Sequence, residues 1–61
     1  MVIEKLVKQV GRQSVLSVEI KNNGLYVNEK CLVVTNKNIN GFTRLFLNAY
    51  RKKYPNVVII K

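Results

Sequence analysis

The sequence predicts one α+β domain of 61 residues: a short N-terminal helix, an antiparallel hairpin or three-stranded meander, one major amphipathic helix packed on the sheet, and a C-terminal strand. Three observations predict this fold. Apolar residues recur at helical spacing near the N-terminus and again between residues 42 and 50. An Asn-Gly pair separates two β-branched segments, and a short apolar run follows the second helical segment.

The first segment, residues 2–10, has the pattern of an amphipathic helix. Its apolar residues fall on one arc when each position is turned by about 100°: Val2, Ile3, Leu6, Val7 and Val10. Gly11 follows and is expected to end the helix. A helix of this length is not stable alone, so we expect it to dock against the rest of the domain.

The middle of the chain predicts a hairpin. Leu16, Val18 and Ile20 alternate on one face of a strand, and the sequence Lys21-Asn22-Asn23-Gly24 that follows is typical of a tight turn. Residues 25–27 begin the return strand. A second turn at residues 28–30 would make a meander with a third strand at 31–34, whereas one bulged strand from 25 to 34 would place a carboxylate on the core face. The sequence therefore favours the meander.

The major helix is predicted from about residue 40 to Lys53. Its apolar residues follow helical spacing: Phe42, Leu45, Phe46, Ala49 and Tyr50. Asn38 or Asn40 would cap its N-terminus, and three cations in the last turn complement the carbonyl end of the helix. Tyr54 precedes Pro55, a position that disfavours helix.

Residues 57–60 are apolar on both faces, which predicts a strand inside the sheet or at a covered interface, pairing beside an earlier strand. The expected core combines the apolar positions of these elements: Leu16, Val18, Ile20, Val27, Leu32, Val34, Phe42, Leu45, Phe46, Ala49, Val58 and Ile60. The apolar arc of the major helix extends further, to Leu47 and Tyr54. Either the first helix buries this flank or a homodimer does.

Charge is distributed unevenly along the chain. Glu4, Glu19 and Glu29 are the only acidic residues, and all precede Lys30. Residues 30–61 contain seven basic residues, which account for +7 of the net charge of +8. Such a field indicates an anionic partner. Nucleic acid is the favoured partner, and an acidic protein is the alternative; a membrane surface is less favoured, because the apolar face of the helix is needed for the core.

The candidate nucleic-acid-binding residues lie mainly on the major helix. Arg44, Asn48, Arg51 and Lys52 share an arc of roughly 100°, which supplies charge for phosphate and groups that read base edges. The neighbouring cations complete the expected site: Lys53, Lys37 and Lys30. The alternative interpretation is a solvated helix face, although such faces usually alternate in sign.

Composition argues against other classes of protein. The chain has no His, one Cys and three scattered Glu, so no metal site, cofactor or catalytic Cys-His pair is expected and the protein is predicted not to be an enzyme. No segment has the roughly 20 apolar residues of a membrane span, which predicts a cytoplasmic protein. The abundance of Asn, Lys and Ile suggests a low-GC bacterium or its phage. The resulting hypotheses are non-enzymatic nucleic-acid binding and, alternatively, a small modulator that docks on an acidic host protein.

Overall fold

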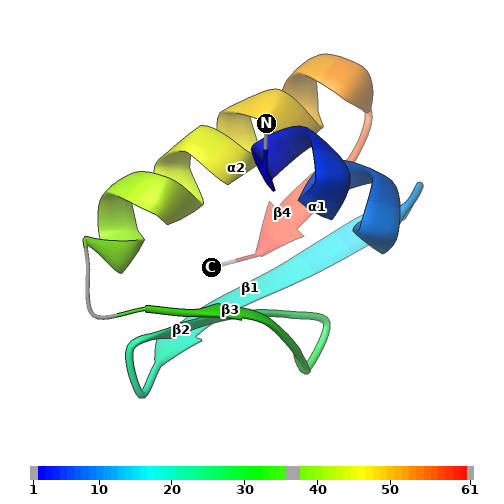
Figure 1. Ribbon diagram of the computed structural model, residues 1–61. Coiled ribbons are helices and arrows are strands. Elements are labelled where there is room, and N and C mark those ends of the chain that lie inside the picture. The colour runs from blue at the N-terminus through cyan, green and yellow to red at the C-terminus, as the bar shows by residue number, and fades with distance from the viewer. Residues whose placement is uncertain (1, 36–37, 61) are drawn as a thin grey trace.

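The computed structural model describes residues 2–35 and 38–60, which form two layers (Figure 1). The elements follow the predicted order: α1 (Val2–Val10), β1 (Val15–Lys21), β2 (Gly24–Val27), β3 (Lys30–Val34), α2 (Ile39–Lys53) and β4 (Val58–Ile60). The strands form one sheet in the order β3-β2-β1-β4, and both helices lie over the same face of it. The predicted α+β fold is confirmed.

Local signals define both helices. Gly11 ends α1 with a positive φ of 74°, and its N–H donates to the Val7 carbonyl over 3.0 Å. Asn38 is the N-cap of α2, because its Oδ1 accepts a hydrogen bond of 3.1 Å from the backbone N–H of Gly41. Of the two predicted caps, Asn38 is therefore the correct one.

The two connections of the meander are two-residue turns. Asn22 and Asn23 have φ of 52° and 59°, and Asn28 and Glu29 have φ of 52° and 68°. Two successive positive values are what a type I′ hairpin turn requires. The meander is therefore confirmed over the bulged strand. The Asn23-Gly24 pair does not occupy the two central positions of the first turn. Asn22 and Asn23 occupy them, and Gly24 is the first residue of β2.

The C-terminal strand is at an edge of the sheet, so the expectation of an interior position is wrong. β4 pairs with β1 in parallel, with Val58 opposite Val15 and Ile60 opposite Ser17. This register points Val58 and Ile60 to the face without helices and leaves Ile59 to pack against the core.

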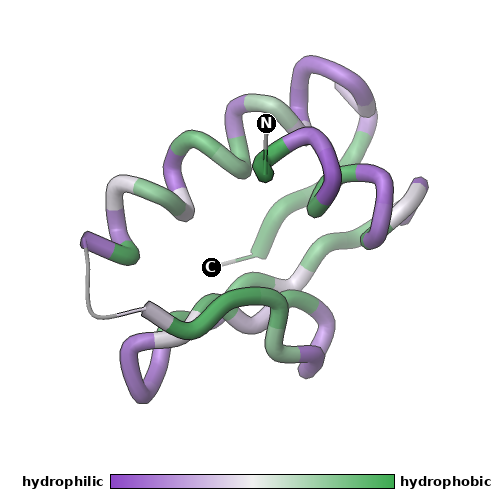
Figure 2. Tube along the Cα trace, viewed as in Figure 1, coloured by the Kyte–Doolittle hydropathy of each residue, from purple (hydrophilic) through white to green (hydrophobic). Residues whose placement is uncertain are grey.

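The core lies between the helices and the sheet, where the apolar segments of both layers face one another (Figure 2). Its buried apolar residues come from both helices and from the two central strands: Ile3, Leu6, Val7, Leu16, Val18, Leu25, Val27, Ile39, Phe46, Leu47 and Tyr50. Three of these belong to α1, which docks as expected. Leu47 is buried within the monomer, where it lines a groove with Val18 and Ile20 of β1, so no second copy is needed to cover it.

Five residues expected in the core are exposed: Ile20, Val34, Leu45, Val58 and Ile60. In β3 an irregularity pairs Leu25 with Val33 but Tyr26 with Cys31, and this shift turns Val34 to the open face. In α2, Leu45 points away from the sheet. Leu32, Phe42 and Ala49 are half-buried at the margin of the core.

No helix within residues 2–35 and 38–60 is long and apolar enough to cross a membrane.

Candidate nucleic-acid interface

The outer face of α2 carries four of the predicted site residues. Arg44, Asn48, Arg51 and Lys52 are all exposed, while the opposite side of the helix is buried against the sheet. The 3.6-residue period places these four side chains on one side, as the sequence predicted. The helix contains no acidic residue, so no carboxylate on α2 compensates this charge. We call this surface the α2 outer face.

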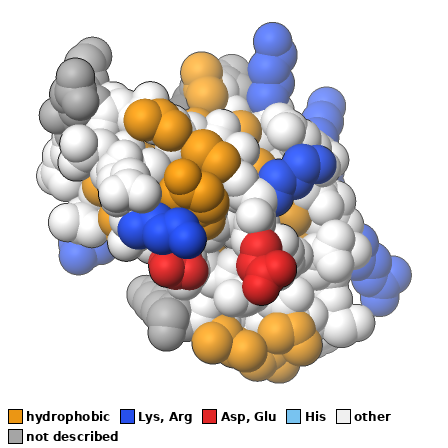
Figure 3. Space-filling model, turned by 90° about the horizontal axis from the view of Figure 1, so that it is seen from below, with side chains coloured by type: hydrophobic (Ala, Val, Ile, Leu, Met, Phe, Trp, Pro, Cys, Tyr) orange, Lys and Arg blue, Asp and Glu red, His pale blue; other side chains and the backbone are white. Residues whose placement is uncertain are grey.

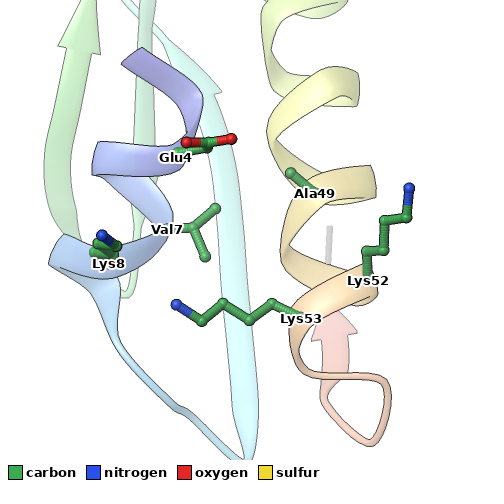
Figure 4. A pocket seen from close by; sticks show the side chains of 6 residues that line it. All are labelled: Glu4, Val7, Lys8, Ala49, Lys52 and Lys53. Carbon is green, nitrogen blue, oxygen red and sulfur yellow. The ribbon is translucent and has the colours of Figure 1, made fainter. Parts of the chain in front are cut away.

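Lys53 lies on a different side of α2, facing α1. It lines an open groove of about 370 Å³ between the two helices, together with Glu4, Val7, Lys8, Ala49 and Lys52. Figure 4 shows the Lys53 side chain extending toward α1, while Lys52 points away from it. The Lys53 ammonium also lies 5.7 Å from the centre of the Tyr54 ring, a cation–π distance. Lys53 is therefore near the α2 outer face but not part of it.

A second groove, of about 360 Å³, begins on the other side of Lys53. Arg12, Gln13 and Ser14 line it from the linker before β1, and residues 53–57 line it from the last residue of α2 and the connection to β4. Because Lys53 lines both grooves, it connects Lys8 of the first groove to Arg12 of the second. Five cations therefore gather around the C-terminal end of α2, and we call them the basic end: Lys8, Arg12, Arg51, Lys52 and Lys53.

Sequence reasoning missed Lys8 and Arg12. Lys8 falls on the polar side of the first helix, and nothing in the local sequence of Arg12 distinguishes it. Their contribution depends on the docking of α1 beside α2, which brings residues about 40 positions apart in the chain to the same grooves.

The structure does not bring Lys30 to this site. Lys30 lines a small depression of about 170 Å³ with Gln9 and Val10 of α1, at the turn between β2 and β3. No residue of α2 lines this depression, which adjoins the second groove through Gln13. Lys37, the remaining predicted site residue, lies outside the described residues.

Two acidic residues share a groove with a cation of the α2 outer face: Glu4 with Lys52, and Glu19 with Arg44. Glu19 is on the strand face without helices, where its carboxylate lies 3.9 Å from the ammonium of Lys21. Glu29 is in the second hairpin turn, and Glu4 lines the groove between the helices. Glu4 is thus the one acidic residue that borders the basic end within the described part of the chain.

The basic end is held in place by a buried tyrosine. The Tyr50 hydroxyl donates to the Gly11 carbonyl and accepts from the Gln13 N–H, so α2 is joined to the segment that contains Arg12. Burial raises the pKa of Tyr50 above its ordinary value of 10.0, although the hydrogen bond from Gln13 acts in the opposite direction. The hydroxyl is therefore neutral near pH 7 and keeps both hydrogen bonds.

Comparison of the chain with protein-family models, curated proteins and solved structures gives no match. The surface chemistry remains as the guide to function. Arginine presents a planar fork that binds phosphate through paired hydrogen bonds, and lysine contributes a mobile point charge. Asparagine both donates and accepts, so Asn48 can contact a phosphate or a base edge.

Proposed function

We propose that this protein binds nucleic acid in the cytoplasm through the α2 outer face, without catalysing a reaction. The observation that carries the proposal is the exposed row Arg44, Asn48, Arg51 and Lys52 on a helix that has no acidic residue. The basic end supports it, because Lys8, Arg12 and Lys53 extend the same sign of charge around the end of the helix.

Contacts to phosphate would supply most of the affinity. The three cations of the α2 outer face are exposed and form no ion pair with another described residue, so they can reach a phosphate backbone directly. Asn48 is the only member able to accept a hydrogen bond from a base. We therefore expect low sequence selectivity and strong dependence on salt, because each neutralised phosphate releases condensed counterions.

Fluorescence anisotropy with labelled duplex DNA, single-stranded DNA and RNA tests this proposal. Nuclease-treated protein would be titrated at salt concentrations from about 50 to 300 mM, the range over which phosphate contacts lose affinity steeply. If three to five cations contact phosphate, the logarithm of the binding constant should fall with that of salt with a slope of about −2 to −5. Absence of binding at the lowest salt would contradict the proposal.

A matched pair of charge reversals locates the site. Arg51→Glu combined with Lys52→Glu should weaken binding to every sequence and reduce the salt slope by about two. The control combines Lys5→Glu with Lys30→Glu, two exposed positions off α2. Each double variant lowers the net charge of +8 by the same four units, since each change replaces one positive charge with one negative charge. Equal loss of affinity in both variants would show that total charge, and not the α2 outer face, determines binding.

An acidic protein is the second candidate partner, and the edge of the sheet favours it. β3 has five residues and is an edge strand of the described sheet, beside β2, so its outer edge offers backbone groups to an added strand. The α2 outer face would attract the same partner electrostatically. Affinity capture from bacterial lysate with and without nuclease separates the two candidates: a stoichiometric protein that stays bound after nuclease supports the acidic partner.

A further inference from the structure

The sheet has one face without helices, and that face exposes large apolar side chains. Strand parity and register assign ten residues to it, which we call the open face: Val15, Ser17, Glu19, Lys21, Gly24, Tyr26, Cys31, Val34, Val58 and Ile60. Four of its β-branched side chains are about half or more exposed: Val15 at 48%, Val34 at 66%, Val58 at 57% and Ile60 at 54%. Figure 3, which views the molecule from below, shows separate orange areas of hydrophobic side chains on this side of the surface.

The open face is also nearly neutral in a strongly basic molecule. Among its strand residues in the described ranges, Glu19 and Lys21 are the only charged ones, and they lie 3.9 Å apart. The Lys21 ammonium is 5.0 Å from the centre of the Tyr26 ring, so its charge is directed across the face toward an aromatic surface. The cations of the α2 outer face belong to the helix layer.

We propose that a second copy of this chain covers the open face. Two molecules with a net charge of +8 repel each other wherever their basic surfaces meet. They can approach with least repulsion through a face whose one carboxylate and one ammonium balance. An acidic protein or a nucleic acid would be attracted to the helix layer instead, because the open face offers it no net positive charge. Charge therefore selects a second copy over these partners.

A two-fold axis makes the contact self-complementary. Each copy would present the same apolar residues, and Glu19 of one copy could approach Lys21 of the other. Both side chains are more than half exposed and their mutual contact is long, so they are free to exchange partners. Sheets packed in this way lie about 10 Å apart. The α2 outer faces would point away from each other, so dimerisation and nucleic-acid binding use different surfaces and fail independently.

The sheet is small, so the dimer should be weak. Its strands have three to seven residues, which places the contact at the low end of interface sizes. We therefore expect dissociation in the range of about 10 µM to 1 mM, where protein contacts of limited area occur. Sedimentation velocity over this range should show the mass rising from the 7.0 kDa monomer toward twice that value.

Two lysine substitutions test which face is covered. Val58→Lys and Val34→Lys each place an ammonium in the interface twice, once from each copy, and should raise the dissociation constant roughly a hundredfold. Leu45→Lys is the matched control, because Leu45 is 59% exposed but lies on α2. It should dimerise like the unmodified chain. Circular dichroism and thermal unfolding would verify that all three variants fold. Because Val34 is in β3 and Val58 is in β4, unfolding of one edge strand could not explain a loss of dimer in both variants.

Cys31 supplies a second measurement without any substitution. It is the only cysteine and is exposed on the open face. Its reaction with a small thiol reagent should slow as protein concentration rises through the dimer range, and Val58→Lys should abolish that slowing. A chain that stays monomeric at about 1 mM overturns the proposal. A dimer that Leu45→Lys disrupts, or that both valine variants leave intact, also overturns it.

Discussion

The Tyr50 hydroxyl in α2 donates a hydrogen bond of 2.6 Å to the carbonyl oxygen of Gly11, the residue that ends α1. The same hydroxyl accepts a hydrogen bond of 3.1 Å from the backbone N–H of Gln13. The side chain is fully buried, and one polar atom thus satisfies two backbone groups of the linker between α1 and β1. Arg12 lies between Gly11 and Gln13, so the hydrogen bonds of Tyr50 fix the position of the Arg12 backbone relative to α2.

Replacing Tyr50 with Phe should destabilise the domain by about 1 to 3 kcal/mol, because it removes both hydrogen bonds and leaves two linker groups without their partner. Urea unfolding followed by circular dichroism would measure the change. Tyr54→Phe is the control, since the structure shows no hydrogen bond to that hydroxyl within the described residues, and it should alter stability by less than about 0.5 kcal/mol. Equal effects in the two variants would exclude the linker contact as the cause.

The raised pKa of Tyr50 predicts a loss of stability in alkali. The folded state holds the proton more tightly than the unfolded chain, whose tyrosine titrates near 10. Below that pH both states are protonated and the contribution is complete. As pH rises above about 10, the unfolded state releases its proton first, so the free energy of unfolding falls. The urea midpoint should therefore drop more steeply between about pH 9 and pH 11 in the unmodified protein than in Tyr50→Phe, in which the other titrating groups are retained. The same pH dependence of the urea midpoint in both proteins would contradict a contribution from Tyr50.

The two leucines at positions 45 and 47 should differ sharply, although both belong to the apolar pattern of the helix. Leu47 is 3% exposed and in the core, whereas Leu45 points to solvent. Leu47→Ala should cost about 2 to 5 kcal/mol, because it leaves a cavity. Leu45→Ala should change stability by less than about 0.5 kcal/mol. Chemical denaturation of the pair checks the orientation of α2, and a reversed order would show that the helix is rotated relative to the sheet.

Thr43 combines burial with an unsatisfied hydroxyl. It is 6% exposed, and its Oγ1 has no hydrogen-bond partner within the described part of the chain. Thr43→Val replaces that hydroxyl with a methyl group of similar shape and should stabilise the domain by about 1 kcal/mol. Thr43→Ser keeps the hydroxyl, removes the methyl group and should destabilise it. A loss of stability in Thr43→Val would mean that the hydroxyl has a partner.

The helices could be predicted from the sequence because their signals are local. The periodic apolar residues and the caps at Gly11 and Asn38 lie within a few positions of the elements they define. Which residues the sheet buries could not be predicted as well. A bulge in β3 and the pairing of β4 with β1 decide which face each side chain takes, and a shift of one residue reverses the pattern. The core expected from the sequence therefore has Val34, Val58 and Ile60 on the wrong face.

The same distinction applies to the candidate site. Arg44, Asn48, Arg51 and Lys52 could be grouped from the sequence because one helix carries them. Lys8 and Arg12 reach the basic end only through the packing of α1 and the linker, which depends on contacts such as Tyr50 to Gly11. The residues next to Lys8 and Arg12 in the sequence do not indicate that these two side chains lie near the end of α2.

The second hairpin turn offers a direct test of backbone strain. Glu29 has φ of 68°, a left-handed conformation that is unfavourable for a residue with a Cβ atom other than Asn or Asp. Glu29→Gly would follow Asn28 with glycine, which is the preferred pair for a type I′ turn. The gain from removing the strain exceeds the entropic cost of glycine, so thermal and urea unfolding should show stabilisation of about 0.5 to 1 kcal/mol.

Removing a carboxylate also changes the charge near Lys30, and Glu29→Gln separates this effect from the backbone effect. The glutamine variant would keep the Cβ atom and the strained φ, so its stability should stay within about 0.5 kcal/mol of the unmodified protein. Stabilisation by the glycine variant but not by the glutamine variant would place the strain in the backbone of the turn. Equal stabilisation by both would assign the effect to charge, and the positive φ would then cost the fold little.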